Sequence, residues 1–107
     1  MAKYLIEATY SQAGIKGVMK EGGTARRAAV QAAGKALGAK VEGFYFGFGS
    51  TDVYVLIDAP DNVTLAALSM AVGAAGSVSR LKTTVLLTPA EIDEATKKHV
   101  KYRAPGA

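Results

Sequence analysis

Two cations and one hydroxyl, Arg80, Lys82 and Thr9, are the side chains from which this sequence could build a site for a small anion. Arginine and lysine hold carboxylates and phosphates through charge-assisted hydrogen bonds, and a threonine hydroxyl adds a neutral donor. Arg80 and Lys82 are two residues apart, which places both on one side of an extended strand. We therefore predict that these three residues bind a ligand.

A carboxylate and two phenols, Glu7, Tyr45 and Tyr54, are the candidates for proton transfer beside such a ligand. A carboxylate in a cavity can accept a proton from a bound molecule, and a phenol can relay one. The alternative interpretation is structural: Glu7 forms an ion pair with Arg80 or Lys82 of a second copy of the chain. Both interpretations place the same groups on one surface.

Other kinds of chemical site lack the residues that they need. The chain has no cysteine, which excludes disulfides, thiolate metal ligands and a cysteine nucleophile. Asp52 and Asp58 lie at opposite ends of one predicted strand, about 20 Å apart, and cannot share a cation within one subunit. His99, the only histidine, is interpreted as a surface residue at the end of the last predicted helix. We predict neither a metal nor a cofactor.

A glycine break at residues 22–24, followed by Arg26 and Arg27, is a second candidate for anion binding. A glycine turn at the start of a helix presents free amides and the positive end of the helix dipole. The lysine and the preceding strand of a P-loop are missing, so that motif is excluded. The alternative interpretation is a helix kink with exposed arginines.

Composition narrows the class of protein and its partners. The chain has 107 residues, of which 50% are hydrophobic and 21% are charged, and this is typical of one globular domain. The net charge of +4 is scattered without interleaved aromatic residues, so we predict no nucleic-acid partner. No apolar run reaches the roughly 18 residues of a membrane span, and we predict no membrane contact. The missing cysteines suit a cytoplasmic location.

Hydrophobic periodicity predicts four strands and a set of helices that alternate with them. The strands are expected at residues 3–10, 40–48, 52–58 and 78–87. The helices are expected at residues 11–20, 26–37, 61–75 and 89–99, with Ser11, Thr24 and Thr88 as N-caps. The order βαββαβ predicts an α+β fold of the ferredoxin-like type, an antiparallel sheet with both long helices on one face and a short C-terminal helix.

The predicted hairpin turn at Ser50-Thr51 separates the side chains of the sheet into two faces. On the apolar face, the opposed pairs are Phe48 and Val53, Phe46 and Val55, and Phe44 and Ile57. The other face carries Leu5, Glu7, Thr9, Tyr45, Tyr54, Leu56, Arg80, Lys82, Thr84 and Leu86. Two helices cannot cover both faces, so the second face is expected to pair with a second copy of the chain through a two-fold axis.

Five stretches of the sequence resemble the GYD domain family. They are residues 4–6, 9–14, 49–52, 58–61 and 82–88. The glycine and aspartate of the name-giving motif are kept as Gly49 and Asp52, and Thr51 stands at the tyrosine position. The resemblance implies a dimeric α+β barrel built from one domain over residues 1–99, with an irregular tail over 100–107. It assigns no reaction.

The sequence therefore leads to three hypotheses about function. The first is a homo-oligomer that binds a small anionic or aromatic metabolite between paired sheets. The second is a cofactor-independent isomerase or monooxygenase of the dimeric barrel type. The third is a structural subunit whose tail, residues 102–106, clasps a neighbouring copy.

Overall fold

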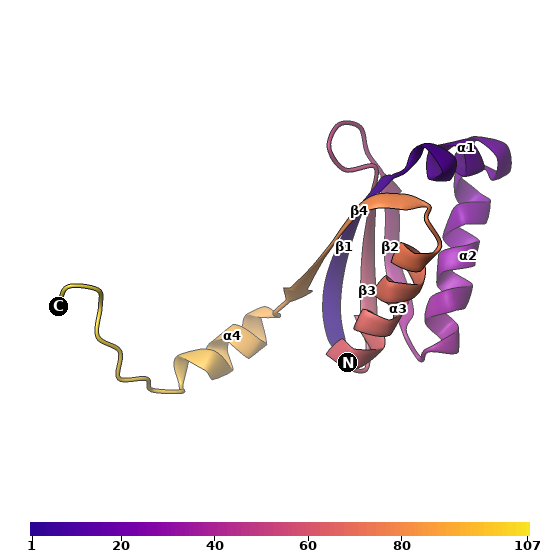
Figure 1. Ribbon diagram of the computed structural model, residues 1–107. Helices are drawn as coiled ribbons and strands as arrows, with labels where there is room; N and C mark the ends of the chain where they lie inside the picture. Colours follow the sequence, from indigo (N-terminus) through magenta and orange to yellow (C-terminus); the bar gives the residue numbers. More distant parts are fainter.

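The protein is a mixed α/β fold in which one four-stranded antiparallel sheet carries helices on one of its two faces (Figure 1). The computed structural model describes residues 1–107. Its elements are β1 (Ala2–Tyr10), α1 (Gln12–Glu21), α2 (Gly23–Ala36), β2 (Lys40–Phe46), β3 (Val53–Ala59), α3 (Asn62–Ala74), β4 (Val78–Leu86) and α4 (Pro89–Thr96). The strands lie in the order β2-β3-β1-β4, and every neighbouring pair is antiparallel. No helix has both the length and the apolar character needed to cross a membrane.

The helices α2 and α3 lie on the same side of the sheet, α1 sits across one end, and α4 projects away from the body (Figure 1). The core is the layer between the sheet and the two covering helices. Its buried residues come mainly from alternate positions of the two central strands: Tyr4, Ile6, Ala8, Val53, Val55, Ile57 and Ala59. From the helices, only Leu65 and Leu68 of α3 join this cluster as buried large side chains. The core is therefore thin on its helical side.

The predicted register of the β2–β3 hairpin was wrong by two residues, although the two faces were assigned correctly. Phe46 lies opposite Val53 and Phe44 lies opposite Val55. Phe48 is therefore outside the sheet, fully exposed in a loop over residues 47–52. Because side chains alternate with a period of two, a shift of two residues leaves each side chain on its predicted face.

The loop is longer than predicted because β1 holds its end. The Asp52 amide donates to the carbonyl of Ala8 at 2.9 Å, and the Asp52 carboxylate accepts from the Tyr10 amide at 2.9 Å. These bonds bind the chain to β1 before β3 begins, so no tight turn is needed at Ser50-Thr51. Thr51, which stands at the tyrosine position of the resembled motif, is buried in this loop.

Three predicted helix starts are confirmed by their side-chain hydrogen bonds. The Ser11 hydroxyl accepts from Gly14, and the Asp61 carboxylate accepts from Thr64. Thr88 and Glu91 form a complete capping box, in which each side chain accepts from the backbone amide of the other residue. The hydrogen bond from Thr64 lowers the pKa of Asp61. These caps satisfy amides that the first turn of a helix leaves free.

The predicted cap at Thr24 is wrong, and so is the predicted extent of the last helix. The helix α2 begins at Gly23, and its N-cap is Gly22, whose φ of 85° is accessible to glycine at little cost. The chain turns at that residue from α1 into α2 without a side-chain cap. At the C-terminus, α4 ends at Thr96, which leaves His99 exposed beyond the helix.

Glycine in α1 is required at one position and dispensable at another. A Cβ atom at Gly14 would lie 1.9 Å from the carbonyl oxygen of Ser77, whereas a Cβ at Gly17 would have no neighbour within 4 Å. We predict that Gly14→Ala destabilises the protein by about 2 kcal/mol or more, because α1 must move off the backbone. Gly17→Ala in the same helix should stabilise it by about 0.7 kcal/mol. Urea denaturation of both variants tests this, and equal effects would contradict the packing.

Candidate functional site

On the face of the sheet opposite α2 and α3, side chains from neighbouring strands lie in rows, which we call ranks, that run across the strands. We call this surface the uncovered face; it comprises Leu5, Glu7, Thr9, Gly43, Tyr45, Tyr54, Leu56, Arg80, Lys82, Thr84 and Leu86. One rank runs Tyr45, Tyr54, Glu7, Lys82, and the next runs Gly43, Leu56, Leu5, Thr84. Tyr45 is 67% exposed and Leu56 is 41% exposed, so no part of the chain packs over them. The face is thus a mixed apolar and polar surface.

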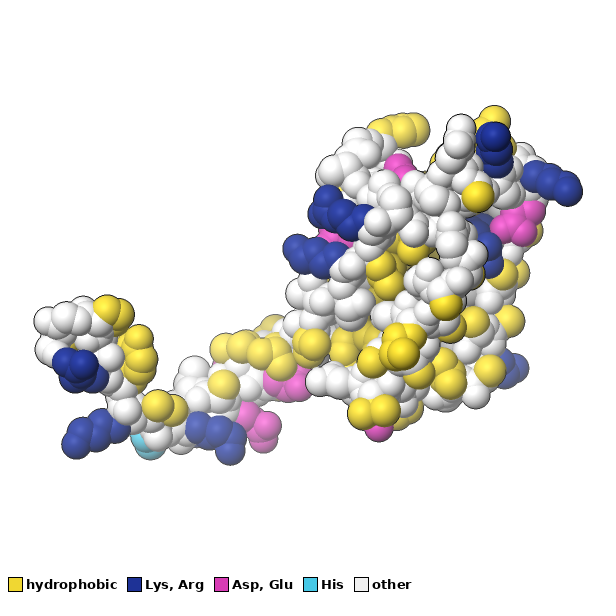
Figure 2. Space-filling view, viewed as in Figure 1, with side chains coloured by type: hydrophobic (Ala, Val, Ile, Leu, Met, Phe, Trp, Pro, Cys, Tyr) yellow, Lys and Arg dark blue, Asp and Glu magenta, His cyan; other side chains and the backbone are white.

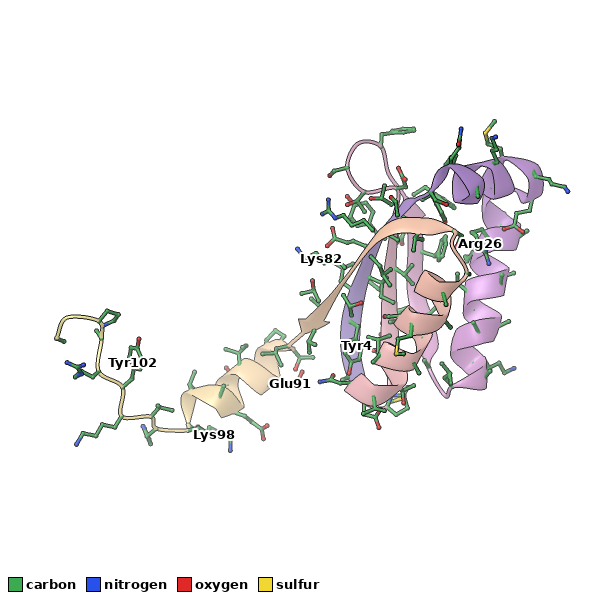
Figure 3. The ribbon with its side chains drawn as sticks, viewed as in Figure 1. Tyr4, Arg26, Lys82, Glu91, Lys98 and Tyr102 are labelled. Carbon is green, nitrogen blue, oxygen red and sulfur yellow. The ribbon has the colours of Figure 1, made fainter.

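The fold brings the six predicted site residues onto this one face. Glu7 lies directly between Tyr54 and Lys82, its partners on the two neighbouring strands. Directly opposed side chains on antiparallel strands have Cβ atoms about 5 Å apart, which is within reach of a shared small ligand. In Figure 3, Lys82 projects from the side of the sheet away from the helices. The remaining pair, Thr9 and Arg80, forms the adjoining rank.

The charged groups of this cluster have no ion-pair partner within the chain. The three ion pairs of the structure join Lys3 to Glu42, Lys3 to Asp58, and Arg26 to Glu21. None of them involves Glu7, Arg80 or Lys82. Two cations and one carboxylate therefore remain available to a ligand or to a second copy of the chain.

Thr9 is engaged more closely than the sequence indicated. Its hydroxyl donates to the carbonyl of Ser50 at 2.5 Å, and its own carbonyl accepts from the Ser79 hydroxyl at 3.3 Å. The hydroxyl proton thus holds the 47–52 loop against β1. The oxygen can still accept a hydrogen bond, but Thr9 does not have a free donor to offer an anion.

The two tyrosine rings pack against glycines, an arrangement that the sequence analysis missed. A Cβ atom at Gly43 would lie 3.1 Å from the Tyr45 ring, and one at Gly47 would lie 2.9 Å from the Tyr54 ring. The absent side chains let each ring lie against the backbone. The signal in the sequence is the spacing of Gly43, Tyr45 and Gly47, each two residues from the next, which places a glycine on either side of Tyr45 on one face of the strand. The glycines therefore position the phenols.

A lysine held by two carboxylates, also missed by the sequence analysis, lies toward the opposite end of the face. Lys3 Nζ lies 2.6 Å from Glu42 Oε1 and 3.0 Å from Asp58 Oδ1. Glu42 reaches it from the irregular β2–β3 pairing between Val41 and Gly43. Hydrogen bonds with Glu42 and Asp58 raise the pKa of Lys3, and hydrogen bonds with Glu42 and Lys3 lower the pKa of Asp58. This cluster ties three strands together.

The glycine break before α2 is a turn between two helices, and no side-chain cap occupies the first amides of α2. The Gly22 amide donates to the carbonyl of Val18 at 2.8 Å, and the Arg26 amide donates to the Gly22 carbonyl. Arg26 Nη1 lies 3.5 Å from Glu21 Oε1, whereas Arg27 is exposed. The phosphate hypothesis at this break therefore stays a prediction.

The fold and the uncovered face define a small α/β protein whose sheet is covered by helices on one side only. The family model of the GYD domain matches residues 4–96, and the chain therefore belongs to the GYD domain family. The resemblance inferred from the sequence is thereby confirmed. No curated protein matches the chain.

The Lys3–Asp58 cluster predicts a pH dependence of stability. Because folding lowers the pKa of Asp58 from 3.8, its contribution is complete above that value and is lost as the pH falls through the lower, folded pKa. The raised pKa of Lys3 means that its contribution is lost only as the pH rises above 10.5. We expect Asp58→Asn to be less stable than wild type at pH 7 in urea denaturation, and the difference to shrink toward zero at the low end of a series that runs down from pH 3.8 through the lowered pKa of Asp58.

The matched control is Asp93→Asn in α4, an exposed carboxylate outside the cluster. It should follow wild type at pH 7 and throughout the series. A deficit of Asp58→Asn that persisted unchanged at low pH would show that the loss has a cause other than the charge of Asp58.

Proposed function

We propose that this GYD domain protein works as a homo-oligomer that holds a small anionic or aromatic metabolite between the uncovered faces of two copies. The observation that carries the proposal is the uncovered face itself, which carries exposed Tyr45 and Leu56 on β2 and β3 and two cations without ion-pair partners, Arg80 and Lys82, on β4. Contiguous apolar surface of this kind usually marks an interface or a ligand site. A two-fold pairing brings the same face of each copy together.

The overall dimensions support a partner for the chain. The accessible surface is 7455 Å² for a mass of 11.1 kDa, whereas a compact monomer of this size exposes about 5,700 Å². The radius of gyration is 16.9 Å, against about 13 Å for a compact domain. The C-terminal arm, residues 87–107, contains α4 and projects from the body, and it accounts for part of the excess in accessible surface and in radius of gyration (Figure 1).

The C-terminal arm also needs a surface to pack on. The helix α4 has eight residues and none of them is buried, and a helix of this length is marginal in water by itself. The apolar side chains of the whole arm are open to solvent, including Ile92 of α4 at 46%, and Val100 and Tyr102 beyond the helix at 81% and 77% exposure. Figure 2 shows hydrophobic side chains along the arm with nothing packed against them. A neighbouring copy would bury them, as the hypothesis of a structural subunit requires.

The strand order supports the finer fold assignment that belongs to this proposal. The order β2-β3-β1-β4 with two helices on one face is the arrangement expected of a ferredoxin-like sheet. Two such sheets placed face to face would form the dimeric α+β barrel. The ligand would then lie inside the barrel, with Arg80 and Lys82 holding its charge. A cytoplasmic location remains our expectation, since a chain without cysteine suits a reducing compartment.

One observation favours a second candidate function, a cofactor-independent isomerase or monooxygenase. Glu7 has no ion-pair partner in the chain and lies between a phenol and an ammonium group, Tyr54 and Lys82. A carboxylate free of a fixed partner can accept a proton from a bound ligand, and a neighbouring cation stabilises the anion that forms. Tyr45, beside Tyr54, is the further proton-transfer candidate.

Pairing through the uncovered face predicts that a charge placed there breaks the oligomer. We expect Leu56→Glu to shift the native mass toward the monomer, because the pairing would bury an unpaired carboxylate. Met70→Glu is the control: Met70 is 73% exposed on α3, on the helical side of the sheet. Light scattering after size exclusion measures both variants. A wild-type chain that is monomeric at high micromolar concentration would contradict the proposal.

The ligand part of the proposal predicts an effect of the two cations. With benzoate as the probe, we expect saturable changes in the amide shifts of Tyr54 and Thr84. In the double variant Arg80→Ala, Lys82→Ala the affinity should fall by about tenfold or more, since a buried anion loses its charge-assisted hydrogen bonds. The control double variant Lys97→Ala, Lys98→Ala changes two exposed cations beyond the sheet. Equal losses in both variants would show a nonspecific effect of net charge.

A further inference from the structure

An apolar groove runs between α2 and α3 on the helical side of the sheet, opposite the uncovered face. Fifteen of its eighteen lining residues are hydrophobic. Four alanines that line it from the two helices are exposed to solvent: Ala29, Ala33, Ala71 and Ala75. Figure 2 shows hydrophobic side chains gathered over α3, beside this region. The groove is therefore an apolar surface that nothing in the chain covers.

The groove forms because the two helices stand over different strands. The helix α2 packs mainly on β2, whereas α3 packs on β4 and β3. Strand residues such as Ile6 and Val53 form the floor between them. A surface helix normally carries charged residues, but α3 has none among its thirteen residues, and Arg26 is the only charged residue that lines the groove. This surface suits an apolar partner whose own charges are negative.

The helix α4 has the features that such a groove would accept. Pro89, Ile92 and Ala95 recur every three residues, which places them on one side of the helix, and none of them is buried. At 1.5 Å per residue, α4 is about 12 Å long and α3 is about 20 Å long, so the whole of α4 can lie along the groove. The charged residues of α4 are all acidic: Glu91, Asp93 and Glu94.

The α4 helix of the same chain is poorly placed to fill the groove. The C-terminal arm leaves the sheet from β4, an edge strand, and projects away from α2 and α3 (Figure 1). Only Leu87 and Thr88 connect β4 to α4. Two extended residues span at most about 7 Å, which is less than the diameter of a helix, about 10 Å. Because α3 stands between β4 and the groove, this connection is too short to carry α4 across it.

We propose that the groove between α2 and α3 of one copy receives α4 of a second copy, with Ile92 against the exposed alanines and the acidic side chains toward Arg26. The inference rests on the self-association proposed above, and it names a second surface for it on the other side of the sheet from the uncovered face. A short helix that is marginal in water is stabilised when its apolar side packs on other helices.

Engineered cysteines test the proposal on the full chain, which has no cysteine of its own. Ile92→Cys is mixed with Ala33→Cys, so that each chain carries one thiol, and the mixture is oxidised. A disulfide between the two different chains is expected, and the mass of the product identifies the chains that it joins. Because a disulfide needs Cα atoms within about 7 Å, the yield should exceed that of control pairs by about fivefold or more.

Each partner in the cross-link has a matched control. Ala28→Cys changes an exposed alanine of α2 that does not line the groove. Ala90→Cys changes an exposed alanine of α4 that lies two residues before Ile92, and therefore on the opposite side of the helix. Equal yields from matched and control pairs would show random collision and would overturn the proposal.

Hydrogen exchange gives a second measurement that needs no cysteine. Exchange of the α4 amides should slow as the protein concentration rises, because docking protects the helix. Ala33→Glu places a carboxylate in the groove against an acidic helix and should remove this protection, whereas Ala28→Glu should keep it. Protection of α4 that survives Ala33→Glu unchanged would contradict docking in the groove.

The proposed function and this inference can fail separately. A matched cross-link, together with a native mass that Leu56→Glu leaves unchanged, would support the groove and contradict pairing through the uncovered face. A mass that Leu56→Glu lowers, without a matched cross-link, would overturn the groove proposal alone.

Two further results would overturn it by identifying another occupant. If the double variant Ile92→Cys, Ala33→Cys forms a disulfide within one chain, α4 lies in its own groove. If Ala33→Cys cross-links to itself as efficiently as the matched pair does, the grooves of two copies face each other and α4 does not lie between them.

Discussion

The constraint on which the structure depends is that two helices can cover only one face of a four-stranded sheet. β1 and β3, at the centre, bury one side of each strand against α2 and α3, and the alternation of side chains places the rest on the other side. Tyr45 and Leu56 are left exposed there for want of a covering element. Burial of the apolar side chains of this face against a second molecule is the interaction that would favour covering it.

A second constraint comes from the size of the side chains on the helices. Because α2 and α3 bury only Gly34, Leu65 and Leu68, the strands contribute most of the buried side chains, and the space between the helices is incompletely filled. Close helix packing is useful at Gly14, where α1 touches the backbone at Ser77. Elsewhere the same small residues leave an open groove. Small residues on the helices thus give a tight contact where two backbones lie close together and leave open space where the backbones lie farther apart.

Local sequence signals predicted much of the fold and part of the candidate site. The capping box at Thr88 and Glu91 was readable because all its partners lie within four residues. The shared face of Glu7, Tyr54 and Lys82 was readable because strand periodicity alone decides it. The end of the β2–β3 hairpin could not be predicted from the sequence, because the hydrogen bonds between Asp52 and β1 join residues more than forty positions apart. The groove between α2 and α3 was likewise hidden, since it depends on how α2 sits against α3.

By itself, the sequence determined the order of the strands and helices, the division of the sheet into two faces and membership of the GYD domain family. These properties follow from periodicity and from short-range hydrogen bonds, which a linear pattern records directly. Only the tertiary structure decided the hairpin register, the binding of Lys3 by Glu42 and Asp58, and the groove between α2 and α3. Each of these is a long-range contact or a space between elements. These features are set by how the elements pack in three dimensions, and local sequence preferences do not determine them.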